Sequence, residues 1–569
     1  MDRPLTANFL QDEYNIQLDG YKQILKTNCD VLLNKGEALY KGRIINISSK
    51  EIFIKFRAQR GLPRINSGNY ICYLLLKEDR KAETVKKICF NELIKKAQYS
   101  FEFKPSVYLP DKNDKDFTIG IFTSFEVDVP EKISSYINSI VYIGIEPPPL
   151  QMLMNLKNYV QSNKENLFLD ADYDKFHNGI VNPVKGNAFE FINKKIALVD
   201  SPIVQGPPGS GKSFLIANLV SRLCCDNKSV LVISLTNQAL TEIAKKEPLK
   251  NLISAERVFK TAVTVSELSQ VKGLKTLPEV GPQKGCLHLA TCFRASFAVI
   301  DDFVNKYDYV FVDEASECTL PMLSMVFELG NKHAFFGDQC QLPPVVELNN
   351  DVIVNRNYSR IVNGLNSISL ILKTYQLLQT YRLPEYSAEC TSRFYKYPVL
   401  SMSENTQILN LKLGGKSLSI PQGTFIFFIK MDNSKAPKEA IDLVCKIAAQ
   451  LVEKDRQTDI TLLSYLKITM KETYKAIIHN STTAGGKILI ETVHRIQGLT
   501  TDYAIYTFPK YLNHKLNSNL INVATSRGTK GNFIIMDRES IEVIRSKYAG
   551  NSICNFFNCI LEQEMYIDL

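Results

Sequence analysis

One stretch decides the fold of this chain: Val204-Gln205-Gly206-Pro207-Pro208-Gly209-Ser210-Gly211-Lys212-Ser213. It has the spacing G-x-x-x-x-G-K-S, which is typical of a phosphate-binding loop. Glycines let such a loop bend until its backbone N–H groups point at phosphate oxygens. Lys212 can reach the β- and γ-phosphates, and the Ser213 hydroxyl can bind Mg²⁺. The predicted nucleotide-binding residues are therefore Gly206, Pro207, Pro208, Gly209, Ser210, Gly211, Lys212 and Ser213.

The sequence on both sides of the loop supports this interpretation. The apolar run 197–204 predicts a buried strand that leads into the loop, and residues 214–222 have helical spacing. A bound phosphate would then lie at a helix N-terminus, where free N–H groups favour anions. We therefore expect the chain to bind a nucleoside triphosphate.

Composition limits the possible classes of protein. A chain of 569 residues is too long for one core, so roughly three or four domains are expected. Its net charge of +9 suits a polyanionic partner without requiring one. No run reaches the ~18 apolar residues of a membrane span, and the N-terminus lacks an apolar targeting segment. We expect a soluble intracellular protein with no membrane partner.

The cysteines predict neither a metal site nor a disulfide framework. There are 13 of them, without repeated C-x-x-C pairs. Scattered thiols of this kind fit a reducing compartment, and no zinc is expected.

The hydrophobic pattern predicts an α/β chain with accessory parts before it. Residues 1–29 form an N-terminal helix, 30–146 a small antiparallel barrel-like domain, and 147–181 a stalk or linker that begins at Pro147-Pro148-Pro149. Residues 182–346 and 347–569 each alternate strand and helix, which indicates two parallel-sheet units.

A phosphate loop needs a second carboxylate at the end of a neighbouring strand. The apolar run 310–312 ends in Asp313 and Glu314. Asp313 is placed to hold Mg²⁺ with Ser213, and Glu314 to accept a proton from attacking water. The alternative is a solvated acidic pair that opens a helix.

Several further blocks occur in a fixed order. They are Gly337-Asp338-Gln339-Cys340-Gln341-Leu342-Pro343-Pro344, Leu235-Thr236-Asn237-Gln238-Ala239, Leu289-Ala290-Thr291-Cys292, Thr380-Tyr381-Arg382-Leu383, Ser392-Arg393-Phe394-Tyr395, Glu491-Thr492-Val493-His494-Arg495-Ile496-Gln497-Gly498 and Asn522-Val523-Ala524-Thr525-Ser526-Arg527. Together these blocks resemble the superfamily 1 helicases of the 5′-to-3′ branch, which includes the up-frameshift RNA helicases and the immunoglobulin-μ-binding helicase.

The resemblance implies a fold and a set of roles. The two units become RecA-like domains in tandem, and residues 30–146 are similar only in style to the family's inserted barrel. Gln341 is expected to sense the γ-phosphate, Gly498 to contact the nucleotide, and Arg382 and Arg527 to act as arginine fingers. The block positions also imply nucleic-acid contacts at Thr236, Asn237, Thr291, Pro343 and Thr492. A guanidinium from the second unit can stabilise charge on the transferred phosphoryl group.

The chain departs from the family pattern at a few positions. Lys185 stands where a glutamine usually reads adenine, which leaves ATP against general NTP use open. Thr500 stands where a glutamate is usual, and Glu317 where a glutamine is common. Thr236 and Asn237 can also be read as the cap of the next helix.

We expect most aromatic residues of these blocks, namely Tyr381, Phe394 and Tyr395, to be core residues rather than base-stacking ones. The expected function is an ATP- and Mg²⁺-dependent helicase or translocase that moves 5′-to-3′ on single-stranded DNA or RNA. Two alternatives stay open: a strand-stimulated ATPase that remodels protein–nucleic acid complexes without unwinding, and a degenerate motor that serves as a nucleic-acid-binding scaffold. The sequence does not identify partners in replication or RNA processing.

Overall fold

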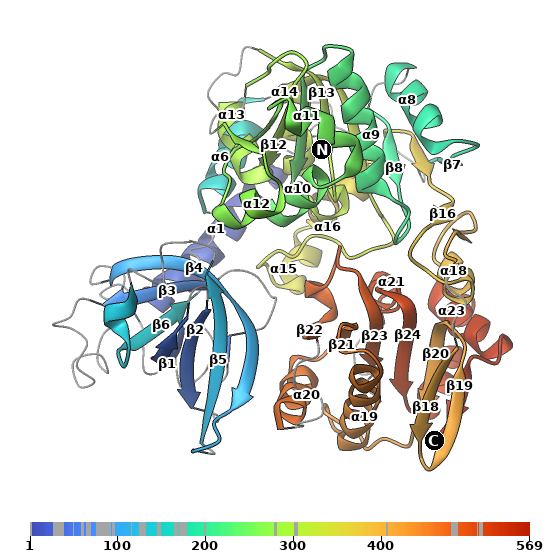
Figure 1. The fold of residues 1–569 in the computed structure, drawn as a ribbon. Coiled ribbons are helices and arrows are strands. Elements are labelled where there is room, and N and C mark those ends of the chain that lie inside the picture. Colours follow the sequence, from blue (N-terminus) through green and yellow to red (C-terminus); the bar gives the residue numbers. More distant parts are fainter. Residues whose placement is uncertain are drawn as a thin grey trace.

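A barrel and two α/β units make up the computed structural model (Figure 1). None of its described helices has the length and apolar character that a membrane crossing requires. The structure describes residues 3–26, 39–48, 51–57, 62–63, 70–75, 93, 97–114, 116–124, 133–144, 150–163, 169, 179–198, 201–277, 281–300, 305–404, 408–479, 487–508, 510 and 516–569. The expected boundary at Pro147-Pro148-Pro149 and most of the expected linker lie outside these residues.

The N-terminal helix and the barrel confirm the expected accessory parts. Helix α1 (Arg3–Lys26) packs against α6 (Leu150–Ser162), and both bury apolar side chains against the first α/β unit. The barrel closes in the order β1-β2-β5-β4-β3-β6. Its strands are β1 (Leu39–Ile47), β2 (Glu51–Arg57), β3 (Tyr70–Leu75), β4 (Ala97–Pro110), β5 (Phe117–Ser124) and β6 (Ile140–Gly144), with η2 (Ser134–Tyr136) before the last.

Alternation explains why these segments close into a barrel. In β2, the side chains of Ile52, Ile54 and Phe56 are buried, while their sequence neighbours are more exposed. Successive side chains of a strand point to opposite faces, so one face of β2 fills the barrel interior. Closure also leaves no unpaired sheet edge.

The first α/β unit is a parallel sheet with helices on both faces. Alternate residues of β9 enter different cores: Leu231 and Ile233 lie in one hydrophobic cluster, Val230 and Val232 in the other. A strand buried on both faces is expected to be continuously apolar, as this one is. The strands of this sheet are β7 (Val181–Pro183), β8 (Ile203–Gln205), β9 (Val230–Ser234), β10 (Val258–Lys260), β11 (Lys275–Thr276), β12 (Leu287–Thr291), β13 (Tyr307–Val312), β14 (Gly330–Gly337) and β15 (Thr374–Gln376).

The helices of this unit lie between its strands in sequence. They are α8 (Ala188–Leu198), α9 (Lys212–Cys225), α10 (Asn237–Ala244), η4 (Glu247–Leu249), α11 (Lys250–Ser254), α12 (Val265–Gln270), α13 (Cys292–Ile300), η5 (Ala315–Glu317), α14 (Leu320–Leu329), α15 (Asn350–Asn355), α16 (Ser359–Val362) and α17 (Gly364–Ile368).

The strand order places the functional loops on one edge. The sheet runs β11-β10-β12-β9-β13-β14-β8-β15-β7, and every pair is parallel. The loops that follow β8, β9, β12, β13 and β14 therefore meet at the carboxyl edge of the sheet, where open α/β sheets bind ligands.

Two sequence expectations need correction here. The strand expected at 197–204 is shorter, because α8 continues to Leu198 and β8 begins only at Ile203. The chain also returns to the first sheet after residue 346, since Thr374 pairs with both Ile203 and Val181. The domain division is still a proposal, and we place the end of the first unit near residue 377.

The second α/β unit is also parallel, in the order β22-β21-β23-β24-β20-β25. Its sheet strands are β20 (Gly423–Phe428), β21 (Asp459–Ser464), β22 (Lys487–Thr492), β23 (Thr501–Thr507), β24 (Gly528–Met536) and β25 (Tyr566–Asp568). Small strands precede them: β16 (Gln379–Thr380), β17 (Leu400–Ser401), β18 (Leu409–Leu413) and β19 (Lys416–Ile420). The helices are α18 (Glu385–Ser392), α19 (Lys438–Lys454), α20 (Lys467–His479), η7 (Val493–Arg495), α21 (Ser518–Ala524), α22 (Glu539–Lys547) and α23 (Ser552–Glu562).

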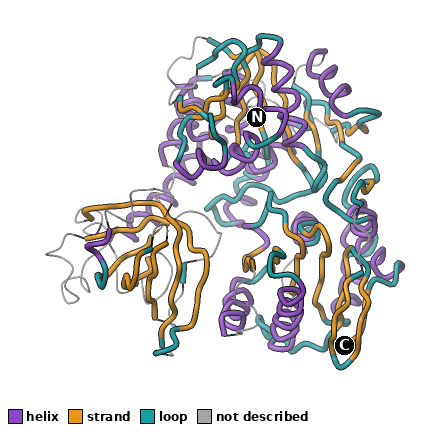
Figure 2. The backbone as a smooth tube through the Cα atoms, in the orientation of Figure 1, coloured by secondary structure: helices purple, strands orange, loops and turns teal. Residues whose placement is uncertain are grey.

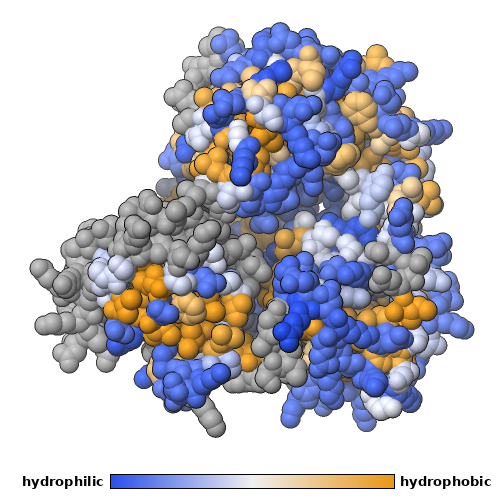
Figure 3. All heavy atoms as spheres, viewed as in Figure 1, coloured by the Kyte–Doolittle hydropathy of each residue, from blue (hydrophilic) through white to orange (hydrophobic). Residues whose placement is uncertain are grey.

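The three parts touch one another. In Figure 1 the first α/β unit lies above the second, and the barrel lies to their left; Figure 2 shows the loops between the two units. Tyr474 and Ile478 of α20 pack against the barrel core, with the Tyr108 and Tyr474 ring centroids 6.0 Å apart. Hydrophilic residues cover most of the visible face of the two α/β units (Figure 3).

Candidate nucleotide-binding site

The phosphate loop connects β8 to α9, as the sequence predicts. Gly209 has a φ of +73°, and a Cβ there would collide with the Cβ of Arg382, so only glycine fits. The Lys212 Nζ donates to the carbonyl oxygen of Gly206 at 2.9 Å. The buried Oγ of Ser210 has no hydrogen-bond partner among the described residues. The loop is thus folded around groups that can bind a phosphate.

The Asp-Glu pair lies directly opposite this loop. Asp313 follows β13, is only 2% exposed, and accepts a hydrogen bond from the Ser213 Oγ at 3.2 Å. Burial raises the pKa of Asp313 to about 7, and the charge of Glu314 adds to this, while Lys212 opposes it. A neighbouring cation would restore the charged carboxylate.

These oxygens fit a magnesium ion. A hydroxyl and a carboxylate in contact are the hard donors that Mg²⁺ takes when phosphates and water complete its coordination. Among the described residues, no group of three or more His, Cys, Asp and Glu side chains could hold a metal ion by itself.

The two arginines expected from the second unit reach this site. Burial lowers the pKa of Arg382, and the nearby charge of Arg527 lowers it further. Burial also lowers the pKa of Arg527, whereas the negative charge of Glu314 raises the pKa of both arginines. Both guanidiniums remain charged at neutral pH. Because these charges affect one another, Arg382 and Arg527 lie near each other and near Glu314.

Hydrogen bonds hold the arginines in place. The Arg382 Nη1 donates to the carbonyl oxygen of Ser526 at 3.3 Å. The Arg527 Nε donates to the carbonyl oxygen of Val523 at 3.0 Å, and its Nη2 to the Oγ of Ser526 at 3.1 Å. The last turn of α21 and the residues after it thus orient both side chains.

Gln341 does not stand free to meet a phosphate. Its Nε2 donates to the Asp338 Oδ2 at 2.8 Å, and the hydroxyl of Tyr395 donates to the same oxygen at 2.6 Å. The Asn522 Nδ2 in turn donates to the Tyr395 hydroxyl and to the Cys340 carbonyl oxygen, at 2.8 Å each. This network, which we call the inter-unit network, connects the loop after β14 to α21.

The residues expected to contact a nucleic-acid strand lie at or after the carboxyl ends of β-strands. Thr236 caps α10, since its hydroxyl accepts from the Ala239 N–H at 3.2 Å, and Asn237 is exposed beside it. Thr291 ends β12, and Thr492 ends β22. The fifth, Pro343, lies in the loop after β14. Gly498 follows η7, and a Cβ there would lie 3.8 Å from the Glu314 Oε1.

Known proteins resemble parts of the chain. Residues 192–347 match the family model described as an AAA domain. The helicase/nuclease DNA2 of Saccharomyces cerevisiae is 26% identical over 166 residues, which are 28% of this chain and 11% of DNA2. A regulator of nonsense transcripts 1 homolog of Arabidopsis thaliana is 22% identical over 417 residues, which are 60% of this chain and 32% of the homolog.

These partial likenesses agree with the resemblance of the chain to superfamily 1 helicases of the up-frameshift-like branch. The chain spans 11% and 32% of the length of these two relatives. Among solved structures, the arterivirus nonstructural protein 10 helicase has a TM-score of 0.36 at 12% identity, covering 89% of this chain and 79% of that one.

The sequence did not predict the position of Tyr381 at this site. We expected a core residue, but its ring is 61% exposed and lies 3.9 Å from a Cβ built on Gly211. The signal was its place directly before Arg382, because a backbone that brings Arg382 to the loop brings Tyr381 as well. Lys185 is exposed in the turn between β7 and α8.

Proposed function

We propose that this chain is an ATP-dependent helicase or translocase. One observation carries the proposal: Arg382 of the second unit lies against Gly209 of the phosphate loop, and Arg527 of the second unit lies near Glu314 of the first. A scaffold or a small-molecule kinase has no need for cations from a second α/β unit. The DNA2 relatives are ATP-dependent helicase/nucleases, and this likeness supports ATP as the nucleotide.

We assign the residues roles from their positions. The phosphate loop and Lys212 hold the β- and γ-phosphates, while Ser213 and Asp313 hold Mg²⁺. When bound, Mg²⁺ neutralises charge on the phosphate oxygens. Glu314 accepts the proton of the attacking water.

The arginines make hydrolysis depend on the approach of the two units. Each guanidinium stabilises the charge that develops on the transferred phosphoryl group, which is worth ~10³–10⁵ in rate for such a finger. Because the inter-unit network also crosses the interface, product release can loosen one unit from the other.

The nucleic-acid strand is proposed to lie across the carboxyl edges of both β-sheets. Thr236, Asn237, Thr291, Pro343 and Thr492 all lie there, and α10 offers a helix N-terminus to a phosphate. Binding should weaken as salt increases, since phosphate contacts dominate such complexes. Movement 5′-to-3′ follows from the family likeness, and both DNA and RNA remain candidate strands.

Lys212→Ala tests the proposal, with Lys228→Ala, at an exposed turn, as its matched control. We expect Lys212→Ala to abolish strand-stimulated ATP hydrolysis while the circular dichroism spectrum and thermal midpoint stay close to those of the wild type. ATPase and duplex-displacement assays with single-stranded DNA and RNA separate the alternatives. Hydrolysis without displacement favours remodelling, and full hydrolysis by Lys212→Ala would refute the assigned site.

A further inference from the structure

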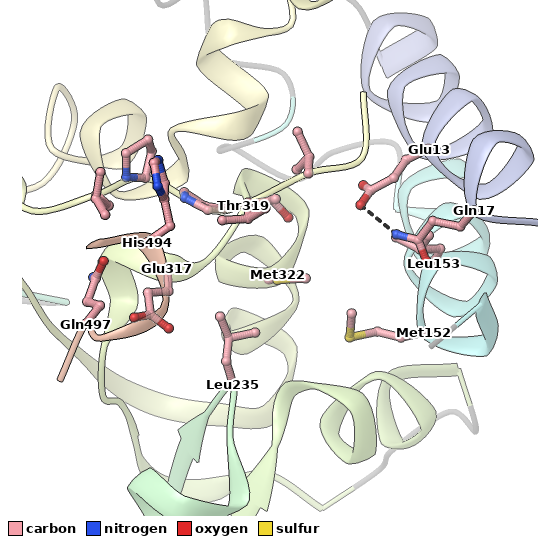
Figure 4. A pocket seen from close by; sticks show the side chains of 15 residues that line it. Glu13, Gln17, Met152, Leu153, Leu235, Glu317, Thr319, Met322, His494 and Gln497 are labelled. Carbon is pink, nitrogen blue, oxygen red and sulfur yellow. Dashed lines mark hydrogen bonds between the residues drawn. The ribbon is translucent and has the colours of Figure 1, made fainter. Parts of the chain in front are cut away.

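A cavity of about 310 Å³ lies where α1, α6 and both α/β units meet (Figure 4). Its volume is at the lower end of the ~300–1,000 Å³ range of ligand pockets. Glu13 and Gln17 of α1 face it from one side, and His494 and Gln497 of the second unit from the other.

The cavity contains polar groups that are poised for a ligand. The Gln17 Nε2 donates to the Glu13 Oε1 at 3.1 Å, which fixes both side chains. The Gln17 Oε1 and the Gln497 Nε2 are buried, and neither has a hydrogen-bond partner among the described residues. Buried polar atoms without partners are costly, so an acceptor and a donor on opposite walls indicate a missing partner.

The rest of the lining selects the chemistry of that partner. Met152, Leu235 and Met322 contribute apolar surface, and the His494 ring lies at the side. The described lining contains the carboxyl groups of Glu13 and Glu317 but no lysine or arginine. Such a lining disfavours a phosphate, whereas it suits a flat, neutral group with hydrogen-bonding edges.

The cavity continues the proposed strand path. Leu235 immediately precedes Thr236, Pro343 is itself part of the lining, and His494 follows Thr492 by two positions. We propose that the cavity takes one unstacked nucleobase of the bound strand, whose edge donates to Gln17 of the N-terminal helix. This proposal rests on the proposed function, because it needs a bound strand.

Two segments that line the cavity are connected to the proposed hydrolytic site. The Glu317 N–H donates to the carbonyl oxygen of Glu314 at 2.9 Å, and Gln497 precedes Gly498, which lies near the Glu314 carboxylate. Entry of a base between Gln17 and Gln497 thus contacts the segments that hold the catalytic glutamate.

The test is an abasic scan. A single abasic site is moved along a deoxyadenosine oligonucleotide, and the Kd for the full-length chain is measured at each position. We expect one position at which the Kd rises about fivefold or more, which is the effect of losing one base contact. A flat profile with intact strand binding overturns the cavity proposal, whereas absence of strand binding overturns the proposed function.

Two variants assign the effect to the cavity. A second oligonucleotide carries purine in place of adenine at the sensitive position. Purine lacks the 6-amino group. Wild type should bind this oligonucleotide about two- to fivefold more weakly, since one neutral hydrogen bond is lost. Gln17→Met should bind both equally, and Asn15→Leu, on an exposed part of α1, should behave as wild type. Retention of the difference in Gln17→Met would remove Gln17 from the base contact.

Discussion

At the scale of single residues, Arg527 combines two tasks. It is 1% exposed and donates a hydrogen bond within the second α/β unit, yet it lies near Glu314 of the first unit. We predict that Arg527→Ala lowers kcat by ~10³–10⁵ and leaves nucleotide affinity within a few fold, because its charge acts on the transition state. Stopped-flow nucleotide binding and steady-state ATPase assays measure the two effects.

Arg527→Lys controls for loss of the fold. It keeps the cation and most of the volume but cannot reproduce the guanidinium geometry. It should fold as wild type and still lose most of kcat. Arg545→Ala, at an exposed site in α22, should leave kcat unchanged. An unchanged kcat in Arg527→Lys would exclude a geometric role for this arginine.

Glu13 predicts a pH dependence of stability. Burial raises its pKa from 4.5 to about 7, and the charge of Glu347 contributes a smaller increase. The native state therefore holds this proton longer than the unfolded state, so its contribution to stability falls as pH rises from about 4.5 to 7. Glu13→Gln should be more stable than wild type by up to about 3 kcal/mol at pH 8 and by little at pH 5.

Thermal unfolding at these two pH values measures this difference. The exposed Glu453→Gln serves as the control and should keep the wild-type pH profile. Parallel profiles for Glu13→Gln and wild type would contradict the raised pKa of Glu13.

The sequence predicted which loops meet at the site. It predicted the hydrogen bonds between their side chains less well. The loop and the Asp-Glu pair predicted that Ser213 and Asp313 lie together, and the Ser213 Oγ donates to the Asp313 Oδ2. Their binding of Mg²⁺ stays a prediction. The sequence did not predict that the Tyr395 hydroxyl donates to the Asp338 oxygen to which Gln341 also donates, because Tyr395 lies far away in the sequence. Contacts of this kind are set by tertiary packing rather than by local pattern.

At the scale of elements, the inter-unit network joins the loop after β14 to α21. Tyr395→Phe removes the donor to Asp338, and Asn522→Ala removes the donor to Tyr395. We expect each variant to lower strand-stimulated kcat/KM by about five- to fiftyfold, equivalent to ~1–2 kcal/mol.

The double variant measures whether the two residues act together. Because they share one hydrogen bond, its loss should be clearly smaller than the product of the single losses. Steady-state ATPase assays on all four proteins give the coupling. Independent, multiplicative losses would show that the two residues do not act through this shared bond.

Element prediction succeeded where the apolar runs are long. Residues 214–222, whose spacing predicted a helix, lie within α9, which buries Leu215, Leu219 and Leu223. Element prediction failed for β15, because Thr374–Gln376 is too short to show a period and its partners lie far away in sequence. Short strands added to a sheet edge carry almost no local signal.

At the scale of the whole molecule, the barrel rests on the second α/β unit through α20. The Tyr108 and Tyr474 rings meet edge to face at 6.0 Å. Such a pair is worth only ~0.5–1.5 kcal/mol beyond its buried area, and contacts between domains are weak by default. We predict that Tyr474→Ala increases the radius of gyration measured by small-angle X-ray scattering.

Lys475, the exposed residue next to Tyr474, provides the matched control for the scattering experiment. Lys475→Ala, which disturbs only the surface ion pair with Glu472, should scatter as wild type. An unchanged radius of gyration in Tyr474→Ala would show that other contacts suffice to hold the barrel.

The position of the barrel follows from how the chain enters and leaves it. The chain arrives from α1 and departs into α6, and both helices pack on the first α/β unit. Attachment on that side is covalent, while attachment to α20 is the packing of Tyr474 and Ile478 against the barrel core. Loss of the α20 contact would therefore leave the barrel tethered to the first unit and would expose the face of α20 that carries Tyr474 and Ile478.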